Sequence, residues 1–196
     1  MLLCTEDMEP NDQQLVKDYL DGDEESFDVL LNRHLKPVYN FIYRICKNKE
    51  DTEEIVQDTF FKTWKNLKKY HEDQSFKTWL YTIAKNTTMD LLRKKKSLTF
   101  SELSDSNDES ENSFQDNIAD EAPLPDELFA LAEKKKLLDN LLDRLPPIYK
   151  EVLLLKYGSE LEFEEIAKIL NKPPETIRSQ HRRALIKLKE CIYSQD

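Results

Sequence analysis

Glycine is almost absent from this sequence of 196 residues, which contains only Gly22 and Gly158. A sheet protein needs many tight turns, and tight turns favour glycine because it accepts positive φ angles. So small a supply predicts an all-α protein. The sequence also shows no strand-like alternation of apolar and polar residues and no internal repeat.

Cysteine and histidine are sparse too, with three of each. The cysteines are odd in number and none has the C-x-x-C spacing, which argues against a disulfide framework or zinc site and favours reduced thiols. The histidines are scattered, and no nucleophile stands beside a candidate base. We therefore expect neither an enzyme nor a metal or cofactor site.

Long apolar runs are missing as well. No stretch approaches the ~18 residues that a membrane-spanning helix needs, and no window resembles a signal peptide. The sequence therefore predicts a cytoplasmic protein.

Negative charge is concentrated in one segment. The net charge is -10, and residues 97–128 contain ten acidic residues without a Lys or Arg, so the remainder is balanced overall. Residues 97–125 are rich in Ser, Asp, Glu and Asn and poor in large apolar side chains. Such a segment cannot bury enough surface to offset the entropy of ordering, and it predicts a flexible acidic linker between two small helical domains.

The first predicted domain, residues 12–96, contains four helical segments with apolar residues at three- and four-residue steps. Asp23 can cap the second segment, in which Pro37 marks either a bend or a restart. Asp51 and Glu54 are placed to form a reciprocal cap for the third. Ser75 can cap the fourth, which ends in the basic run of residues 93–96.

The second predicted domain, residues 126–192, also consists of helices. The first ends at Leu145-Pro146-Pro147, and a second is expected over about residues 148–157, ending at Gly158. A third should span roughly residues 163–170. Asn171-Lys172-Pro173 then breaks the chain before a last helix over about residues 175–192.

Residues 161–190 form the most informative pattern, a predicted helix-turn-helix with a basic second helix. Ile177, Ala184, Leu185 and Leu188 can face inward. Between Thr176 and Lys189 the sequence has five Lys and Arg residues and no Asp or Glu. A short break before a basic helix fits a DNA major groove. The alternative is an ordinary solvated amphipathic helix. We interpret His181 as a surface residue.

These residues resemble a known family. Residues 164–173, followed by 176–179 and by Arg183-Ala184, resemble the fourth conserved region of bacterial sigma factors. Residues 51–64 resemble the second region, and residues 76–86 continue it. Two such segments joined by a linker, without a third domain, resemble the extracytoplasmic function (ECF) group. The resemblance covers roughly residues 12–96 and 126–190.

The resemblance implies a polymerase-binding edge on the third segment. Its residues would be Asp51, Glu54, Gln57 and Asp58, docking on a basic coiled coil of core RNA polymerase. Without the family, Asp51 and Glu54 are explained as a helix cap. Phe60 and Trp64 are predicted to be core residues rather than contacts.

The resemblance also implies that the fourth segment opens promoter DNA at the minus-ten box. Asn86 matches the position that captures a flipped base, for which its amide has suitable donors and an acceptor; otherwise it is a plain exposed polar residue. Lys77, Lys85, Arg93 and Lys94 would hold the backbone of the separated strand. Trp79 is expected to pack inside, and Tyr81 could stack on bases.

The last helix would read the minus-thirty-five box. Arg178, Ser179 and Arg183 match positions that face this box in the family, and Arg182 and Lys187 share the basic face. Arg suits guanine edges, and Ser and Lys suit phosphates. Here the turn reads Pro173-Pro174-Glu175-Thr176, and Glu175 is favourable for the helix dipole but repulsive to a nearby phosphate.

The resemblance therefore implies a sigma factor: a promoter-specificity subunit that recruits core polymerase for transcription initiation in a stress or envelope response. An anti-sigma factor is the expected regulatory partner. The acidic linker is either attracted to basic channels of the polymerase or is a solubilising spacer. The alternative function is a stand-alone helix-turn-helix regulator that binds duplex DNA without polymerase.

Overall fold

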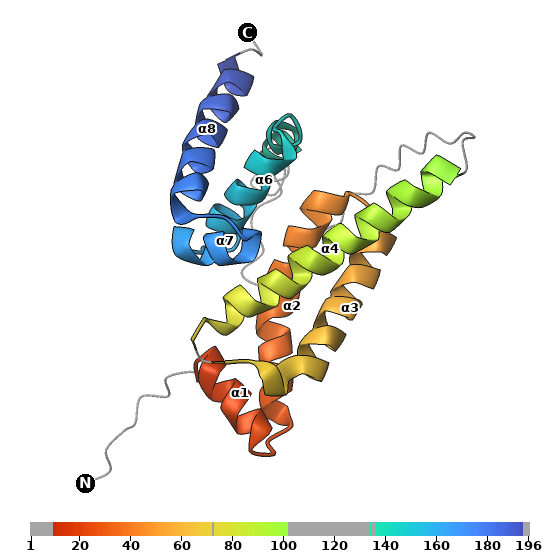
Figure 1. The fold of residues 1–196 in the computed structure, drawn as a ribbon, viewed down its shortest axis with the longest axis vertical. Helices are drawn as coiled ribbons and strands as arrows, with labels where there is room; N and C mark the ends of the chain where they lie inside the picture. The colour runs from red at the N-terminus through yellow and green to blue at the C-terminus, as the bar shows by residue number, and fades with distance from the viewer. Residues whose placement is uncertain (1–9, 72, 102–133, 135, 194–196) are drawn as a thin grey trace, which may run out of the picture.

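The computed structural model describes residues 10–71, 73–101, 134 and 136–193, and within these ranges it contains helices and no strand. Figure 1 shows two groups of helices. The N-terminal half, residues 10–101, contains α1 (Asp12–Leu20), α2 (Glu25–Cys46), α3 (Lys49–Asn66), the 3₁₀ turn η1 (Leu67–Lys69) and α4 (Phe76–Ser101). The C-terminal half, residues 134–193, contains α6 (Pro147–Leu153), the π-helical turn η2 (Leu154–Gly158), α7 (Phe163–Leu170) and α8 (Pro174–Tyr193). The predicted all-α class is confirmed.

Helix starts in the N-terminal half follow short polar side chains. The Ser75 hydroxyl accepts from the Thr78 amide at 3.2 Å, as predicted. Asp23 accepts from the Glu25 amide at 3.2 Å, one residue before the cap position of α2. The predicted Asp51–Glu54 cap is wrong. Asn48 caps α3 by accepting from the Asp51 amide at 2.9 Å, so the helix begins three residues earlier than predicted, at Lys49.

α2 runs without interruption through Pro37, so a restart at this residue is wrong. Buried residues precede and follow the proline, among them Leu30, Val38 and Ile42. Because a proline inside a helix removes one backbone hydrogen bond, packing of this apolar stripe has to hold the helix together. α2 ends at Cys46, and Lys47 after it caps the helix with a left-handed φ of 56°.

The core face of α3 contains three fully buried threonines, Thr52, Thr59 and Thr63. Two of their hydroxyls donate to the backbone carbonyl four residues earlier, Thr52 to Asn48 at 2.6 Å and Thr63 to Thr59 at 2.8 Å. These bonds satisfy polar groups that would otherwise be costly to bury. α3 therefore packs closely without large side chains at these positions.

The C-terminal half follows the predicted boundaries closely. Pro147 is the first residue of α6, where its missing amide hydrogen costs nothing. Glu162 and Glu165 form a reciprocal capping box on α7, and Asn171 ends this helix with a left-handed φ of 51°. The expected helix over residues 148–157 is present, but its last turn widens into η2.

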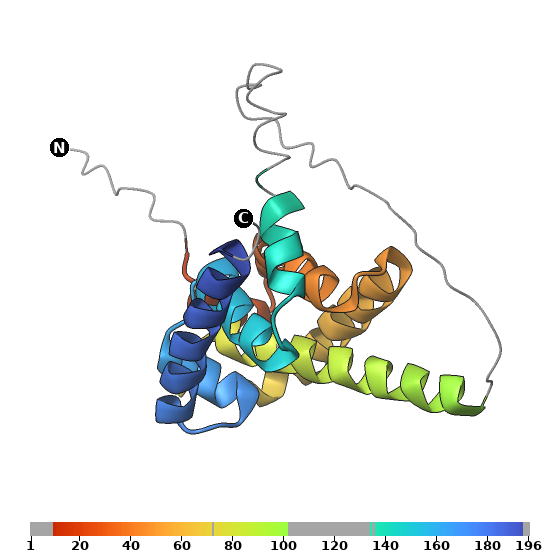
Figure 2. The same cartoon turned by 90° about the horizontal axis from the view of Figure 1, so that it is seen from above.

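The two halves are in contact, with α7 packed against α4. Figure 1 shows α7 beside the start of α4, and Figure 2 shows the far end of α4 extending away from the other helices. α4 continues to Ser101, so it includes the first five residues of the predicted linker, 97–101. The rest of the predicted linker lies outside the described residues.

Candidate nucleic-acid and polymerase interfaces

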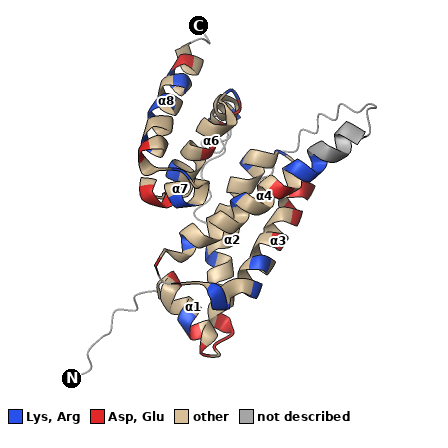
Figure 3. Cartoon of the chain, in the orientation of Figure 1, with Lys and Arg blue, Asp and Glu red and all other residues tan. Residues whose placement is uncertain are grey.

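α8 has one buried side and one basic side. Ile177 and Ala184 are fully buried against the preceding helices, and Leu188 is half-buried. Figure 3 shows Lys and Arg along this helix. All five predicted DNA-binding residues of α8 are exposed: Arg178, Ser179, Arg182, Arg183 and Lys187. α7, the turn at Asn171 and α8 together form the predicted helix-turn-helix.

The cations of α8 differ in their local charge environment. Within the described part of the chain, neither Arg182 nor Arg183 has a carboxylate within ion-pair distance. Lys187 Nζ lies 3.8 Å from Glu190 Oε2. Arg178, by contrast, contacts two carboxylates, those of Glu164 and Glu175. The middle of the helix therefore has the cations that are most available to a polyanion.

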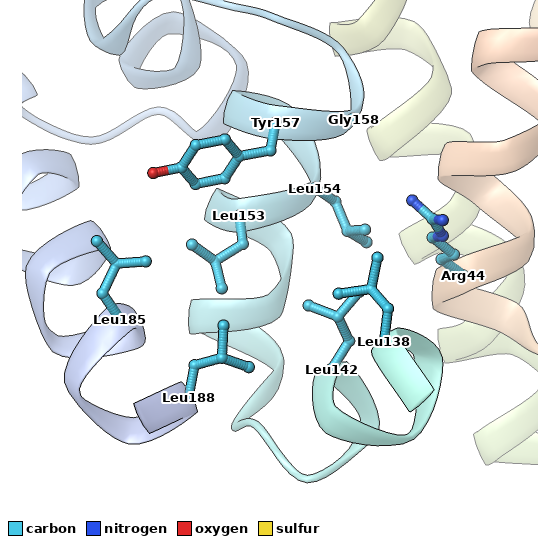
Figure 4. A pocket seen from close by; sticks show the side chains of 9 residues that line it. All are labelled: Arg44, Leu138, Leu142, Leu153, Leu154, Tyr157, Gly158, Leu185 and Leu188. Carbon is cyan, nitrogen blue, oxygen red and sulfur yellow. The ribbon is translucent and has the colours of Figure 1, made fainter. Parts of the chain in front are cut away.

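The other edge of α8 borders an apolar groove (Figure 4). Leu185, predicted to face inward, lines this groove and is 39% exposed. Leucines and Tyr157 form most of the wall, and Arg44 approaches from α2. α8 thus offers two distinct surfaces, one basic and one apolar.

His181 is not a simple surface residue as predicted. Its Nε2 lies 3.0 Å from the Tyr157 hydroxyl, and its ring packs edge-on against Phe163 at 5.1 Å between centroids. Burial lowers the pKa of His181, and the nearby Lys156 cation lowers it further. The neutral imidazole therefore helps to join α8 to α7 and η2.

The predicted DNA-binding residues of α4 fall on two sides of the helix. Asn86 and Arg93 are exposed and lie seven residues apart, so they share one side. Lys94 is also exposed. Lys77 and Lys85 are half-buried and lie near carboxylates of the C-terminal half, Lys77 near Glu165 and Lys85 near Glu151. The five residues therefore do not form one patch in this arrangement.

Glu165 connects the two halves. Its Oε1 accepts hydrogen bonds from the Ser75 hydroxyl at 2.7 Å and the Thr78 hydroxyl at 2.8 Å, while its Oε2 accepts from the Glu162 amide at 2.9 Å. Burial alone would raise the pKa of Glu165, but these three hydrogen bonds outweigh it and lower the pKa. The carboxylate therefore both caps α7 and holds it against the start of α4.

Ion pairs add to this contact at the end of α2. Arg44 Nε lies 3.4 Å from Asp139, and Lys47 Nζ lies 3.0 Å from Asp143. Asp143 also pairs with Lys150 at 2.6 Å. Burial would raise the pKa of Asp143, but the two lysines hold it below its ordinary value.

Tyr81, expected to be available for stacking on bases, is fully buried. Its ring packs edge-on against Phe41 with centroids 5.3 Å apart. Burial raises the pKa of Tyr81, and the nearby Ser159 of the C-terminal half lowers it in part. Trp79 is partly buried against the core, as predicted.

The four predicted polymerase-binding residues share one side of α3. Glu54 and Gln57 are exposed. Asp51 is only 14% exposed at its side chain and forms an ion pair with Lys95 of α4. Asp58 pairs with Lys62 at 2.7 Å. The structure thus brings the four together, with two of the acids already engaged by lysines.

An aromatic pair extends this side of α3. Phe61 and Trp64 are 56% and 49% exposed, and their ring centroids lie 6.0 Å apart. The Trp64 indole N–H donates to the Tyr19 hydroxyl of α1 at 2.7 Å. Phe60 is buried, as predicted. The prediction of Trp64 as a core residue is wrong, because it lies on the exposed side of α3, beside Phe61.

Comparison with known proteins resolves the family. The Sigma-70 region 2 model matches residues 30–98, and the Sigma-70, region 4 model matches residues 135–188. The chain belongs to the ECF group of RNA polymerase sigma factors. The matches cover both helical halves of this sigma factor in the expected order, so the stand-alone regulator is not supported.

Curated relatives match along most of the sigma factor. It is 29% identical to ECF RNA polymerase sigma factor SigW of Bacillus subtilis (strain 168) over 185 residues, covering 94% of this chain and 98% of the relative. It is also 29% identical to the ECF RNA polymerase sigma-E factor of Escherichia coli (strain K12) over 177 residues, covering 88% of this chain and 90% of the relative.

Solved structures share its fold. One is CnrH in complex with the cytosolic domain of CnrY, with a TM-score of 0.68, 20% identity and coverage of 94% of this chain and 99% of that chain. Another is the sigma factor RpoE in complex with the anti-sigma factor NepR from Bartonella quintana, with a TM-score of 0.65, 23% identity and coverage of 86% and 98%. Within the described residues of our sigma factor, no helix combines the length and apolarity needed to cross a membrane.

Proposed function

We propose that this sigma factor binds core RNA polymerase and directs it to specific promoters, without catalytic activity of its own. The observation that supports this proposal best is the pairing of two matched regions, each with a suitable exposed surface. One is the polar side of α3, and the other is the basic side of α8. A protein that only bound DNA would not need the α3 surface, and a protein that only bound polymerase would not need the basic side of α8.

In this proposal, α3 contacts the polymerase through the exposed Glu54 and Gln57, with Asp51 and Asp58 beside them. Asp51 and Asp58 already pair with Lys95 and Lys62 of the same half. When these acids dock on a basic partner, cations of the partner would replace the two lysines. The net gain from such an exchange is small for exposed pairs. Phe61 and Trp64 add apolar area that such an exchange does not supply.

α4 and α8 would contact DNA in different forms. Asn86 and Arg93, on the exposed side of α4, would meet the separated strand of the minus-ten box. Arg178, Ser179, Arg182, Arg183 and Lys187 would face the duplex of the minus-thirty-five box. Lys77 and Lys85 reach DNA only after the C-terminal half leaves their side of α4, because Glu165 and Glu151 now lie there.

An anti-sigma factor is the regulatory partner we propose, as in the RpoE–NepR complex, whose fold this chain shares. The apolar groove beside α8 and the exposed side of α3 are surfaces that such a protein could cover. An envelope or stress signal would then act by releasing the sigma factor.

The test is reconstitution with core polymerase. The full chain should co-purify with core enzyme, and the complex should select promoters with two boxes from a randomised duplex library and yield run-off transcripts from them. Core enzyme alone should give no such transcripts. Sequence-specific binding of the isolated chain to duplex DNA, without association with polymerase, would contradict the proposal.

A further inference from the structure

Arg178 is held between carboxylates of two different helices. Its Nη2 donates to Glu164 Oε1 of α7 at 2.5 Å, and its Nη1 donates to Glu175 Oε1 in the first turn of α8. The three side chains are exposed to different degrees, 45% for Arg178, 59% for Glu164 and 82% for Glu175. The guanidinium is therefore fixed in direction while remaining accessible.

Because of these two carboxylates, the local charge at the start of the basic side of α8 differs from that at its middle. One arginine and two glutamates leave a local charge of -1 around Arg178. Arg182 and Arg183, one turn further on, have no carboxylate within ion-pair distance among the described residues, which leaves a local charge of +2. A phosphate is thus attracted to the middle of the helix and repelled at its start.

From this geometry we infer that Glu175 is a specificity-determining residue for duplex DNA. Its carboxylate offsets the attraction of Arg178 for backbone phosphate and, with Glu164, pre-orients the guanidinium for a base edge. The inference rests on the proposed function, because it takes α8 as the helix that reads the duplex.

The chemistry of the two possible DNA contacts separates them. A phosphate carries a full negative charge and is repelled by Glu175, whereas the major-groove acceptors of a guanine are neutral and are not repelled comparably. A guanidinium has five N–H donors, so the bonds to Glu164 and Glu175 leave three for DNA. Arg178 can therefore keep both carboxylates and still donate to a base.

The experiment compares Glu175→Gln with the natural chain, each assembled with core polymerase. The probes are a duplex containing the selected upstream box and a scrambled duplex of equal length and composition. We expect affinity for the scrambled duplex to rise about two- to fivefold, the range of one exposed charge interaction. Affinity for the selected box should change less than twofold. The slope of log affinity against log salt on the scrambled duplex should steepen by about one phosphate contact.

Glu190→Gln is the matched control, because Glu190 is an exposed glutamate on the same helix that pairs with Lys187 at the same i,i+3 spacing. It makes the same charge change but should raise both affinities equally. The second control places Glu175→Gln in an Arg178→Ala background, where the change in the specificity ratio should disappear. Base substitutions in the upstream box should locate the affected preference at one position.

Two results would overturn the inference: an equal rise on both duplexes for Glu175→Gln, or the same loss of specificity when Arg178 is already absent. Failure of the proposed function looks different. In that case the natural chain with polymerase would show no preference between the selected and scrambled duplexes, and the inference would fall with it.

Discussion

At the scale of a residue, the Asn86 side chain is accessible to a ligand. It is exposed, on a side of α4 that it shares with Arg93. Its amide is therefore available to a ligand even while the two halves are in contact. The family resemblance identifies the position, and the structure adds that nothing among the described residues has to move before the side chain can be reached.

Replacing this amide tests the base contact directly. We expect Asn86→Ala to lower promoter opening by about tenfold, consistent with loss of a base contact worth ~1–3 kcal/mol. Polymerase binding should be unchanged because the four predicted polymerase-binding residues all lie on α3, whereas Asn86 lies on α4. Permanganate reactivity of the melted thymines measures opening. Gln13→Ala, which removes an exposed amide from α1 instead, is the control. Unchanged opening in Asn86→Ala would remove the assigned role.

Arg183 is the corresponding residue on α8. If it donates two hydrogen bonds to a base, Arg183→Ala should weaken upstream-box binding by ~1–3 kcal/mol and relax the preference at one position. Equilibrium binding of the polymerase complex to single-base variants of the box is the measurement. A loss of the same size on every sequence would instead identify a phosphate contact.

Residue positions were predictable where local spacing decides them. The buried Ile177 and Ala184 and the exposed arginines of α8 follow from helical periodicity alone. Partners distant in the sequence do not follow from periodicity. The Lys95–Asp51 ion pair joins residues 44 positions apart, and the burial of Tyr81 depends on packing against Phe41.

At the scale of an element, α3 shows where the hydrophobicity pattern of a sequence fails to predict which side chains are buried. Its core face uses threonine where large apolar residues are expected, and the exposed face has Phe61 and Trp64. A hydrophobicity pattern assigns such aromatics to the core. The signal that could have placed them correctly is the i, i+4, i+7 spacing of Gln57, Phe61 and Trp64, which puts both rings on the same side as a polar contact residue.

The start of α3 gives a stability prediction. Asn48→Ala removes the acceptor for the Asp51 amide and should destabilise the first turn by ~0.5–2 kcal/mol. Native-state hydrogen exchange of the first amides of α3 reports this loss. Asn48→Asp keeps a side-chain acceptor and should retain most of the protection. Equal exchange in all three proteins would show that the cap contributes nothing.

At the scale of the whole molecule, polar bonds add to the apolar packing between the halves. Glu165 accepts from Ser75 and Thr78, and ion pairs link the end of α2 to Asp139 and Asp143. No feature of the sequence predicts these pairs, since each joins residues more than 85 positions apart. The ion pairs at the end of α2 are partly exposed and exchange readily with water, so this part of the contact costs little to break.

Thr78→Val tests this contact because it removes one hydroxyl from a fully buried position while nearly conserving shape and leaving the capping box of α7 intact. We expect the variant to populate separated halves more often, seen as a larger radius of gyration in small-angle scattering. Thr88→Val, also buried in α4 but bonded to its own helix, is the control. The same radius in all three proteins would contradict the expectation.

Lowering the pH should also favour separation of the two halves. Because the pKa of Glu165 is lowered in the folded chain, its carboxylate stabilises the contact above the ordinary pKa of glutamate, about 4.3, and loses this contribution as the pH falls through the lowered value. The radius of gyration should therefore begin to rise below about pH 4.3. Glu165→Gln should be insensitive to pH in this range apart from other acid groups, among them Asp143, whose pKa is also lowered.

The proposed recognition of two boxes sets a distance that the two halves together have to cover. Boxes centred about 25 base pairs apart are separated by roughly 85 Å of B-form DNA, at ~3.4 Å per base pair. Residues 102–133 lie between the last residue of α4 and the described start of the C-terminal half. Fully extended, a chain of that length spans at most about 105–115 Å, at ~3.3–3.6 Å per residue. The helices themselves cover part of the distance, since α4 alone is about 39 Å long over its 26 residues, at ~1.5 Å per residue. The contour length therefore exceeds what binding to both boxes requires.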